Sequence, residues 1–335
     1  MKILHLIKEI LFDNVAKPIL KEKKILYKRP HYDFISYGKK NPKSIFYVIR
    51  RSPGAGLFSN LIYVLNHLKI AEKHNFIPII DMENFPTIYN EKRAINGTKN
   101  SWLYYFKPVS KYSLAEVYKS KNIILSKNRF YDVFTHKIYN EKSLLKLSKK
   151  IIIKKNIKEK ANNFLNKIFI NKHKILGVHY RGTSYKDAAN HPFPPTYSQL
   201  VKKIDNLIKI KRFDKIFFAT EDEGMFNQIK QKYKSKLIFY HSFRSVKDDA
   251  FKKYTRPNHR FKLGEEILIE SLILSKCNTF LFVETNVSAF VRFLKIKNQT
   301  LIPFNNGINS SNALIARWLW YIKKMLPTKL GGFSW

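Results

Sequence analysis

The second half of the chain alternates between short apolar runs and helical patterns, and this alternation is the strongest constraint on its fold. The apolar runs that predict strands cover residues 175–181, 215–220, 236–241, 279–284 and 300–304. The helical patterns between them cover residues 196–210, 224–233, 264–277 and 287–296. Strands that alternate with helices of this length indicate a parallel sheet covered by helices. We therefore predict an α/β fold.

The first half contains one unit of the same kind. Residues 44–51 predict a strand, residues 52–56 a tight loop, and residues 57–75 an amphipathic helix. A second predicted strand follows at residues 78–82. This order indicates a β-loop-α-β unit.

The remaining stretches are less regular. We expect a basic helical lead-in with a terminal polar loop over residues 1–43, irregular chain over 83–135 and Lys-rich helical chain over 141–170. An amphipathic pattern at residues 313–326 predicts a last helix that packs back across the domain interface. A chain of 335 residues is long enough for two domains, which we place at residues 1–170 and 171–335.

Polar side chains follow the predicted strands of the second half at their carboxyl ends. They are His179 and Arg181, then Thr220, Glu221 and Asp222, then His241, and finally Glu284, Thr285 and Asn286. The carboxyl ends of parallel strands meet at one edge, where α/β proteins bind ligands. His179 and Arg181 share a strand face, and a guanidinium has the donor geometry for phosphate. The sequence therefore predicts an anion-binding crevice at this edge.

Each of these residues also has a purely structural interpretation, which the sequence leaves open. His179 bound to a backbone carbonyl and Arg181 paired with a carboxylate would need no ligand. Asp187, in the polar loop beyond them, is either solvated or a general base for an acceptor hydroxyl. Asp222 suits a simple helix cap as well as a ligand contact.

Two helix starts offer a second kind of anion site. Thr285, Asn286 and Ser288 open a predicted helix directly after a strand, and helix N-termini bind phosphate, with capping alone as the alternative. Gly54 and Gly56 precede the first helix, but they lack the Lys-Ser/Thr pair of a Walker loop and the third glycine of a dinucleotide fingerprint. Because no cluster of His, Cys, Asp or Glu has metal-ligand spacing, we expect no metal or other cofactor.

The charge balance is strongly basic, with 63 Lys and Arg against 24 Asp and Glu and a formal net charge of +39. This charge suits a nucleic-acid binder, a protein on an anionic membrane or an enzyme for a polyanionic substrate. A compositional bias toward lysine explains it equally well, because the lysines are spread along the whole chain. The lack of a recognised nucleic-acid-binding module disfavours the first class.

The cellular setting is indicated by what the chain contains. Its one cysteine, Cys277, rules out an internal disulfide framework and fits a reducing cytoplasm. We find no signal-peptide core and no run of about eighteen apolar residues, so we expect a cytoplasmic protein that is soluble or peripheral on the inner face of a bacterial membrane. A basic aromatic surface suited to anionic lipid comprises Trp318, Trp320, Tyr321, Lys323 and Lys324.

Four segments, in this order, resemble a known enzyme family. They read GVHYRGTSYKDAANH, FFATEDEGMF, EEILIESLILSKC and FLFVETNVSAF, with looser matches at GAGLFSN and WLYYFKPVS. Over roughly residues 45 to 300 the chain resembles the fucosyltransferases related to nodulation fucosyltransferase, core α1,6-fucosyltransferase and the protein O-fucosyltransferases.

The resemblance implies two facing Rossmann-like domains of the GT-B type, with the acceptor on the first and GDP-fucose on the second. It implies a metal-independent reaction with inversion at the anomeric carbon. Arg181 matches the arginine that neutralises the β-phosphate, and Asp187 matches the proposed base. The other matches to donor-binding positions are His179 and Glu270 near the guanine, Glu221 and Asp222 in the acidic turn, and Thr285, Asn286 and Ser288 in the phosphate turn.

The chain departs from the family pattern at three positions. Gly182 replaces a second arginine, Ser184 replaces an aspartate, and Glu270 replaces a shorter aspartate. The predicted function is transfer of L-fucose, or a related deoxyhexose, from a GDP-sugar to a hydroxyl of a glycan or glycolipid in bacterial polysaccharide assembly. A nucleic-acid-binding protein and a non-catalytic sugar-nucleotide-binding scaffold are the alternatives.

Overall fold

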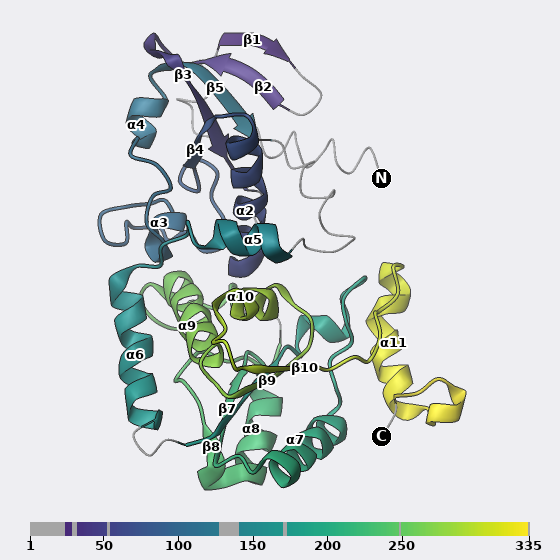
Figure 1. Cartoon of the computed structure of the whole chain (residues 1–335). Coiled ribbons are helices and arrows are strands. Elements are labelled where there is room, and N and C mark those ends of the chain that lie inside the picture. Colours follow the sequence, from purple (N-terminus) through teal and green to yellow (C-terminus); the bar gives the residue numbers. More distant parts are fainter. Residues whose placement is uncertain are drawn as a thin grey trace. The chain divides into compact units, whose positions relative to one another are not determined.

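The computed structural model describes residues 24–28, 32–51, 54–126, 141–169, 173–247 and 249–333 (Figure 1). The chain divides into two compact units. Unit 1 comprises Met1–Lys154 and Arg256–Gly264, and unit 2 comprises Lys155–Thr255 and Glu265–Trp335. Among the described residues, each unit contains one five-stranded sheet.

The sheet of unit 2 is parallel throughout. Its strands are β6 (Ile175–Tyr180), β7 (Lys215–Thr220), β8 (Leu237–Ile238), β9 (Thr279–Phe282) and β10 (Thr300–Pro303). They lie in the order β10-β9-β6-β7-β8. The chain runs outward from β6 to β8 and then crosses back to β9, so the strand order reverses between β6 and β9. The predicted α/β fold with a parallel sheet is confirmed, and this reversal is where such sheets bind ligands.

The helices of unit 2 follow the predicted alternation. They are α6 (Lys155–Phe169), α7 (Tyr197–Lys211), α8 (Glu223–Tyr233), α9 (His259–Leu274), α10 (Asn286–Leu294) and α11 (Ala313–Met325). Three short 3₁₀ turns are η3 (Ser184–Lys186), η4 (Lys234–Lys236) and η5 (Thr328–Leu330). The first residues of α9, up to Gly264, belong to unit 1. A capping box between Thr196 and Gln199 fixes the start of α7.

The two faces of β6 pack against different layers. Leu176, Val178 and Tyr180 face one apolar core, which also contains residues of α7 and α8. Gly177 faces the opposite way, where a Cβ atom would lie 3.0 Å from the Sγ atom of buried Cys277. Because strand side chains alternate, His179 and Arg181 belong to the face of Gly177.

Unit 1 combines parallel and antiparallel strands. Its strands are β1 (Lys24–Lys28), β2 (Tyr32–Ser36), β3 (Lys40–Ile49), β4 (Ile77–Ile80) and β5 (Ser120–Ser126), in the order β1-β2-β5-β3-β4. Its helices are α2 (Leu57–Lys73), α3 (Trp102–Tyr105), α4 (Leu114–Val117) and α5 (Glu141–Ser148). β3 pairs in parallel with β4 and β5, whereas β2 pairs antiparallel with β5 and β1. The predicted β-loop-α-β unit corresponds to β3, α2 and β4.

Three expectations for the first half are wrong. Where the structure describes the predicted helical lead-in, it contains β1 and β2, and β3 begins within the predicted polar loop. Residues 1–23 of that stretch lie outside the described residues. The predicted irregular region, 83–135, contains β5, to which β2 is hydrogen bonded. In β2, pairing with the distant strand β5 overrides the local helical preference of the basic segment.

The observed bounds of two predicted elements also differ from the predicted bounds. β8 is a two-residue strand rather than the six residues expected, and the stretch 141–170 is divided into α5 and α6. No helix among the described residues is both long enough and apolar enough to span a bilayer.

Candidate active site

The carboxyl ends of β6, β7 and β9 bring the predicted polar residues of unit 2 to one edge of the sheet. β6 is paired with both neighbours in register, with His179 beside Ala219 on β7 and Phe282 on β9. Arg181 leaves β6, Glu221 leaves β7, and Thr285 follows β9 at the start of α10. The topology therefore groups these residues around the reversal point of the sheet.

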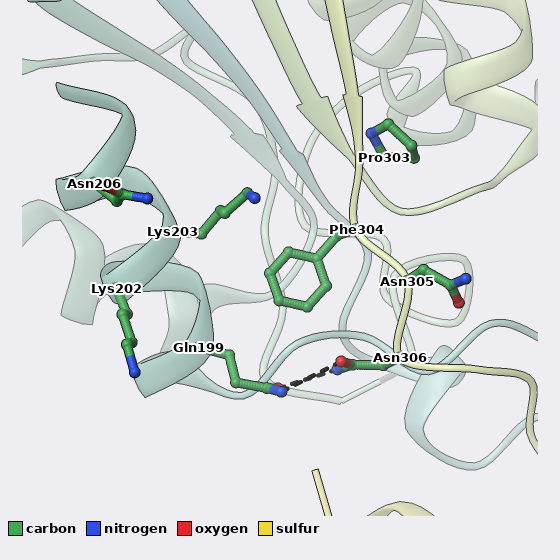
Figure 2. Close-up of a pocket in the computed structure, with 8 residues that line it drawn as sticks. All are labelled: Gln199, Lys202, Lys203, Asn206, Pro303, Phe304, Asn305 and Asn306. Carbon is green, nitrogen blue, oxygen red and sulfur yellow. Dashed lines mark hydrogen bonds between the residues drawn. The ribbon is translucent and has the colours of Figure 1, made fainter. Parts of the chain in front are cut away.

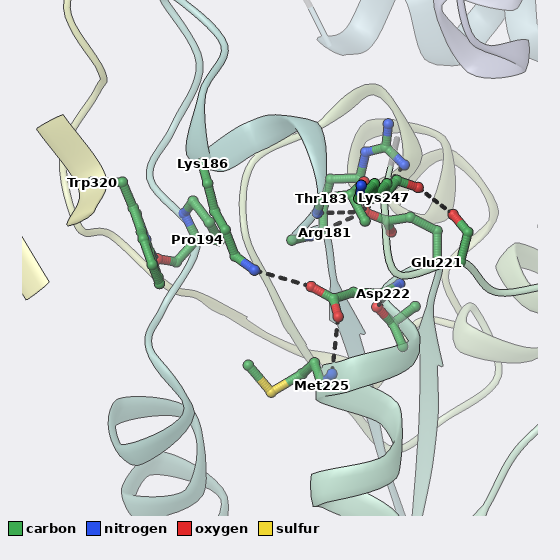
Figure 3. Close-up of polar contacts among 12 residues, drawn as sticks. Arg181, Thr183, Lys186, Pro194, Glu221, Asp222, Met225, Lys247 and Trp320 are labelled. Carbon is green, nitrogen blue, oxygen red and sulfur yellow. Dashed lines mark hydrogen bonds and ion pairs between the residues drawn. The ribbon is translucent and has the colours of Figure 1, made fainter. Parts of the chain in front are cut away.

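Glu221 organises the turn that follows β6. Its Oε1 atom accepts hydrogen bonds from the amides of Gly182 at 3.0 Å and Thr183 at 3.2 Å, and from the Thr183 hydroxyl at 3.0 Å (Figure 3). Nη1 of Arg181 lies 3.3 Å from the same oxygen. Burial acts to raise the pKa of Glu221, but Arg181 and the hydrogen bonds outweigh it and hold that pKa below its usual range. Glu221 is therefore an ionised carboxylate that fixes the turn.

The Arg181 guanidinium is oriented but remains accessible. Its Nη2 atom donates to the Ser184 hydroxyl at 3.2 Å, and its Cζ atom lies 5.5 Å from the centroid of the Tyr185 ring. The Arg181 side chain is 32% exposed. An arginine held in this way has its orientation settled before an anion arrives, which lowers the cost of ordering it.

Asp222 is a helix cap and an ion-pair partner. Its Oδ1 atom accepts the Met225 amide at 2.9 Å, which caps α8, and Nζ of Lys186 lies 3.1 Å from its Oδ2 atom (Figure 3). A Cβ atom at Gly182 would lie 2.6 Å from that Oδ2 and 2.2 Å from Cε1 of Tyr180. The turn therefore excludes the second arginine that the family pattern has at position 182.

His179 is buried behind Arg181 and is 3% exposed. Its Nδ1 atom is buried with no hydrogen-bond partner among the described residues. Burial, assisted by Arg181 and opposed by Glu221, lowers the pKa of His179 to about 4. The imidazole is therefore neutral at pH 7, with a ring nitrogen that no described group satisfies.

Glu270 lies on α9 and is 3% exposed. Its Oε1 atom accepts the Ser242 hydroxyl at 2.6 Å and lies 3.9 Å from Nη2 of Arg244. Burial raises the pKa of Glu270 to about 7, against the lowering effects of Ser242 and Arg244. Glu221 also acts on this pKa, which places the two carboxyl groups within electrostatic range of each other.

Ser242 and Arg244 were not singled out from the sequence. They come from the loop after β8, and the Arg244 guanidinium stacks 3.8 Å from the centroid of the Phe226 ring. The local sequence gives one indication that Arg244 belongs to the site: it is an arginine in a polar loop that precedes the Glu-Glu pair at 265–266.

The start of α10 is closed by its own side chains. The Thr285 Oγ1 atom accepts the Ser288 amide at 3.0 Å, and the Ser288 Oγ atom accepts the Thr285 amide at 2.9 Å. These hydroxyls therefore serve as a capping box. Asn286 is the first residue of the helix, so the feature that this segment presents to an anion is the helix N-terminus itself.

Asp187 is exposed and directly follows η3. Helix α11 packs against η3, which brings Tyr321 within electrostatic range of Asp187. Burial and Asp187 raise the pKa of Tyr321 above its usual range. Tyr321 is thus a third residue that the sequence did not place at the site, because α11 lies far along the chain.

Gly54 and Gly56 lie in unit 1, between β3 and α2. Gly54 has φ +96°, a conformation that favours glycine, and Gly56 is the N-cap residue of α2. The two glycines therefore shape the entry to α2, while residues 52–53 lie outside the described ranges.

A separate hollow of about 690 Å³ lies between the first half of α7 and the chain after β10 (Figure 2). It is lined by Gln199, Lys202, Lys203, Asn206, Pro303, Phe304, Asn305 and Asn306. Gln199 and Asn306 exchange hydrogen bonds across one end. None of the predicted site residues lines this hollow. In the part of the chain that the structure describes, no group of three or more His, Cys, Asp or Glu could hold a metal ion.

No protein-family model and no curated protein matches the chain. Among solved structures, a NodZ α1,6-fucosyltransferase soaked with GDP-fucose is similar over 75% of this chain and 93% of its own, with 14% identity and a TM-score of 0.48. Fucosyltransferase NodZ from Bradyrhizobium is similar over 75% and 92%, with 14% identity and a TM-score of 0.46. POFUT1 in complex with GDP is similar over 77% and 98%, with 10% identity and a TM-score of 0.44. The two NodZ proteins are fucosyltransferases, and the POFUT1 structure holds GDP.

Proposed function

We propose that the protein is an inverting, metal-independent glycosyltransferase that moves L-fucose or a related deoxyhexose from a GDP-sugar to a hydroxyl of a glycan. Unit 2 would bind the donor and unit 1 the acceptor. The observation that carries the proposal is the accessible Arg181 guanidinium, held by Glu221 and Ser184 at the reversal point of a parallel sheet.

The leaving GDP is where charge develops in such a transfer. Arg181 would neutralise the β-phosphate, and the N-terminus of α10 would stabilise the same negative charge. A guanidinium already fixed by a carboxylate and a hydroxyl needs little rearrangement as the bond to the sugar breaks.

Two buried groups suit the guanine base. Guanine has adjacent N–H groups that can donate hydrogen bonds to an ionised Glu270 carboxylate. A ring nitrogen of His179 can form a hydrogen bond with another polar atom of the base. The unsatisfied Nδ1 of His179 and the raised pKa of Glu270 both describe buried groups that would gain from a ligand. This pair supports a purine nucleotide with an N–H edge over other nucleotides.

Asp187 is the proposed base for the acceptor hydroxyl. It is exposed, it lies beyond the arginine along the same segment, and Tyr321 lies within electrostatic range of it. Replacing Asp187 with asparagine should leave GDP affinity near the wild-type value and lower fucosyl transfer, because the proton acceptor alone is lost. Equal transfer by both proteins would remove Asp187 from the mechanism.

Thermal shift with GDP, UDP, CMP and a short RNA tests the donor class in one measurement. We expect stabilisation by GDP well above that by UDP or CMP. Stabilisation by RNA alone would favour a nucleic-acid-binding protein instead. GDP binding without hydrolysis or transfer of GDP-fucose, across a panel of glycan acceptors, would leave a non-catalytic scaffold.

A further inference from the structure

Helix α11 exposes a continuous apolar stripe. The exposed fractions are 71% for Leu314, 53% for Ile315, 67% for Trp318, 42% for Tyr321, 49% for Ile322 and 85% for Met325. At 3.6 residues per turn, these six positions fall within an arc of about 120°. Large apolar side chains gathered on one exposed face, rather than scattered singly, indicate an interaction surface.

The opposite side of α11 is held in the fold of unit 2. Ala316 is fully buried and Trp320 is 5% exposed, packed with Phe193 and Phe333. The Trp320 indole donates to the carbonyl of Pro194 at 2.8 Å. Trp320 therefore anchors the helix and does not belong to the outer aromatic surface expected from the sequence. The stripe stays exposed because the helix is already fixed by its other face.

Cationic side chains flank the stripe. On the helical projection, Arg317 and Lys324 lie together along one edge of the apolar arc, and both are exposed. Lys329 is exposed in η5, one turn beyond the end of α11, beside Leu330, which is 69% exposed. An apolar stripe with an aromatic residue and flanking cations is the pattern of a helix that lies in the interface of an anionic membrane.

We infer that α11 docks the protein on an anionic lipid surface, with Trp318, Ile322 and Met325 inserted and Arg317 and Lys324 over the headgroups. The net charge of +39 favours a negatively charged partner. It disfavours a second copy of this chain on the same face, because the flanking cations would meet one another. This inference does not depend on the nature of the sugar or its nucleotide.

One consequence does rest on the proposed function. Tyr321 lies at the edge of the stripe and within electrostatic range of Asp187, and α11 packs against η3, so a docked α11 holds the proposed base close to the lipid surface. That position suits an acceptor glycan carried on a lipid.

Vesicle sedimentation tests the docking directly. Wild-type protein should sediment with phosphatidylcholine vesicles that contain phosphatidylglycerol, more weakly at high salt, and poorly with phosphatidylcholine alone. The double substitution Trp318→Glu with Met325→Glu should weaken this binding by at least about tenfold. Ile210→Glu is the matched control, because Ile210 is 68% exposed on α7 and outside the stripe. Both variants should keep the wild-type thermal shift with GDP, which reports on folding and donor binding separately.

Tryptophan quenching by brominated lipid identifies the inserted residue. Trp102 and Trp320 are 2% and 5% exposed, whereas Trp318 is 67% exposed. With Trp335 replaced by phenylalanine in every protein compared, Trp318→Phe should still sediment with anionic vesicles but lose most of the quenching. The inference is overturned if wild-type protein binds neither vesicle, if the double variant binds like Ile210→Glu, or if quenching survives in Trp318→Phe. Dimerisation that the double variant abolishes would show instead that a second copy covers the stripe.

Discussion

β3 of unit 1 and β6 of unit 2 both begin a β-loop-α-β unit and both are followed directly by arginine, yet the arginines differ. Arg50 and Arg51 are 6% and 5% exposed. Arg50 donates from Nε to the Ser126 carbonyl at 2.8 Å, and Arg51 donates from Nε to Asn60 Oδ1 at 3.2 Å. Their guanidinium groups are built into the structure of unit 1.

Arg181 follows the same kind of strand but stays within reach of solvent. Its guanidinium lies beside the Glu221 carboxylate and donates to the Ser184 hydroxyl, whereas that of Arg50 donates to the backbone carbonyl of Ser126. The comparison therefore separates an arginine that is fixed to the backbone of its own unit from one whose side chain is partly exposed beside a carboxylate. The two strand ends should therefore respond differently to the same kind of substitution.

The largest expected effect is on turnover, at Arg181. Arg181→Ala should lower GDP-fucose turnover on the order of 100- to 1,000-fold, because it removes the cation that faces the leaving diphosphate. Arg181→Lys should recover part of the loss, since it restores charge without the planar fork. Steady-state kinetics would measure both. Near-normal turnover by the alanine variant would mean that Arg181 is as structural as Arg50.

The matching substitution in unit 1 should act on stability. Arg50→Met should lower the free energy of unfolding by about 2 kcal/mol, because the buried Ser126 carbonyl loses its charged donor. The contact between the Arg50 guanidinium and Phe85, at 5.1 Å, is lost as well. Urea unfolding measures the change, and GDP affinity should be unaltered. A large loss of GDP affinity without loss of stability would reverse the assignment.

The sheet of unit 2 was predictable because parallel strands that are buried on both faces have sequences of consecutive apolar residues. β6 and β7 were placed within one residue of their observed bounds. β1, β2 and β5 were missed since they form the edge and antiparallel part of a sheet, where polar residues and lysines interrupt the pattern. The stability of β2 comes from pairing with β5, far along the chain, which no local window contains.

The candidate site divides in the same way. Arg181 and Glu221 were found because strand ends mark the edge of a parallel sheet, and their ion pair confirms that they meet. Asp222 and Thr285 do cap helices, as their structural interpretation had it. Ser242, Arg244 and Tyr321 were missed because they reach the site from a loop and a distant helix. Their contacts depend on the path of the chain and not on any spacing in the sequence.

A smaller effect, on GDP affinity, should separate the two roles of Glu221: its hydrogen bonds to the turn after β6 and its negative charge beside Arg181. Glu221→Ala should weaken GDP binding about tenfold, since the turn of Gly182 and Thr183 loses its acceptor. Glu221→Gln keeps a side-chain oxygen for those amides and should change the affinity less than the alanine variant does. Isothermal titration calorimetry would measure both. Equal losses would show that the ionised carboxylate, rather than the hydrogen-bonded turn, positions Arg181.

The smallest expected effect is a pH dependence that belongs to unit 2 alone. With a pKa of about 7, Glu270 must lose its proton to accept guanine N–H groups, so GDP affinity should fall about fourfold from pH 8 to pH 6.5. The unliganded protein should respond in the opposite sense. A carboxyl whose folded pKa is raised contributes stability below its unfolded pKa, and that contribution is lost as pH rises toward 7.

Glu270→Gln should flatten both profiles, whereas Arg50→Met should keep the wild-type slopes, because Arg50 belongs to the other unit. GDP affinity and melting temperature, measured across the same pH series, would test whether the two quantities change in opposite directions. His179 acts in the opposite sense over an overlapping range, because its contribution to stability is lost as pH falls from its usual pKa of 6.5 to about 4. The Glu270 contribution to stability should therefore be measured above pH 6.5, where that of His179 is constant. A GDP affinity that strengthens on acidification would exclude an ionised Glu270 as the guanine acceptor and leave Arg181 as the main carrier of nucleotide affinity.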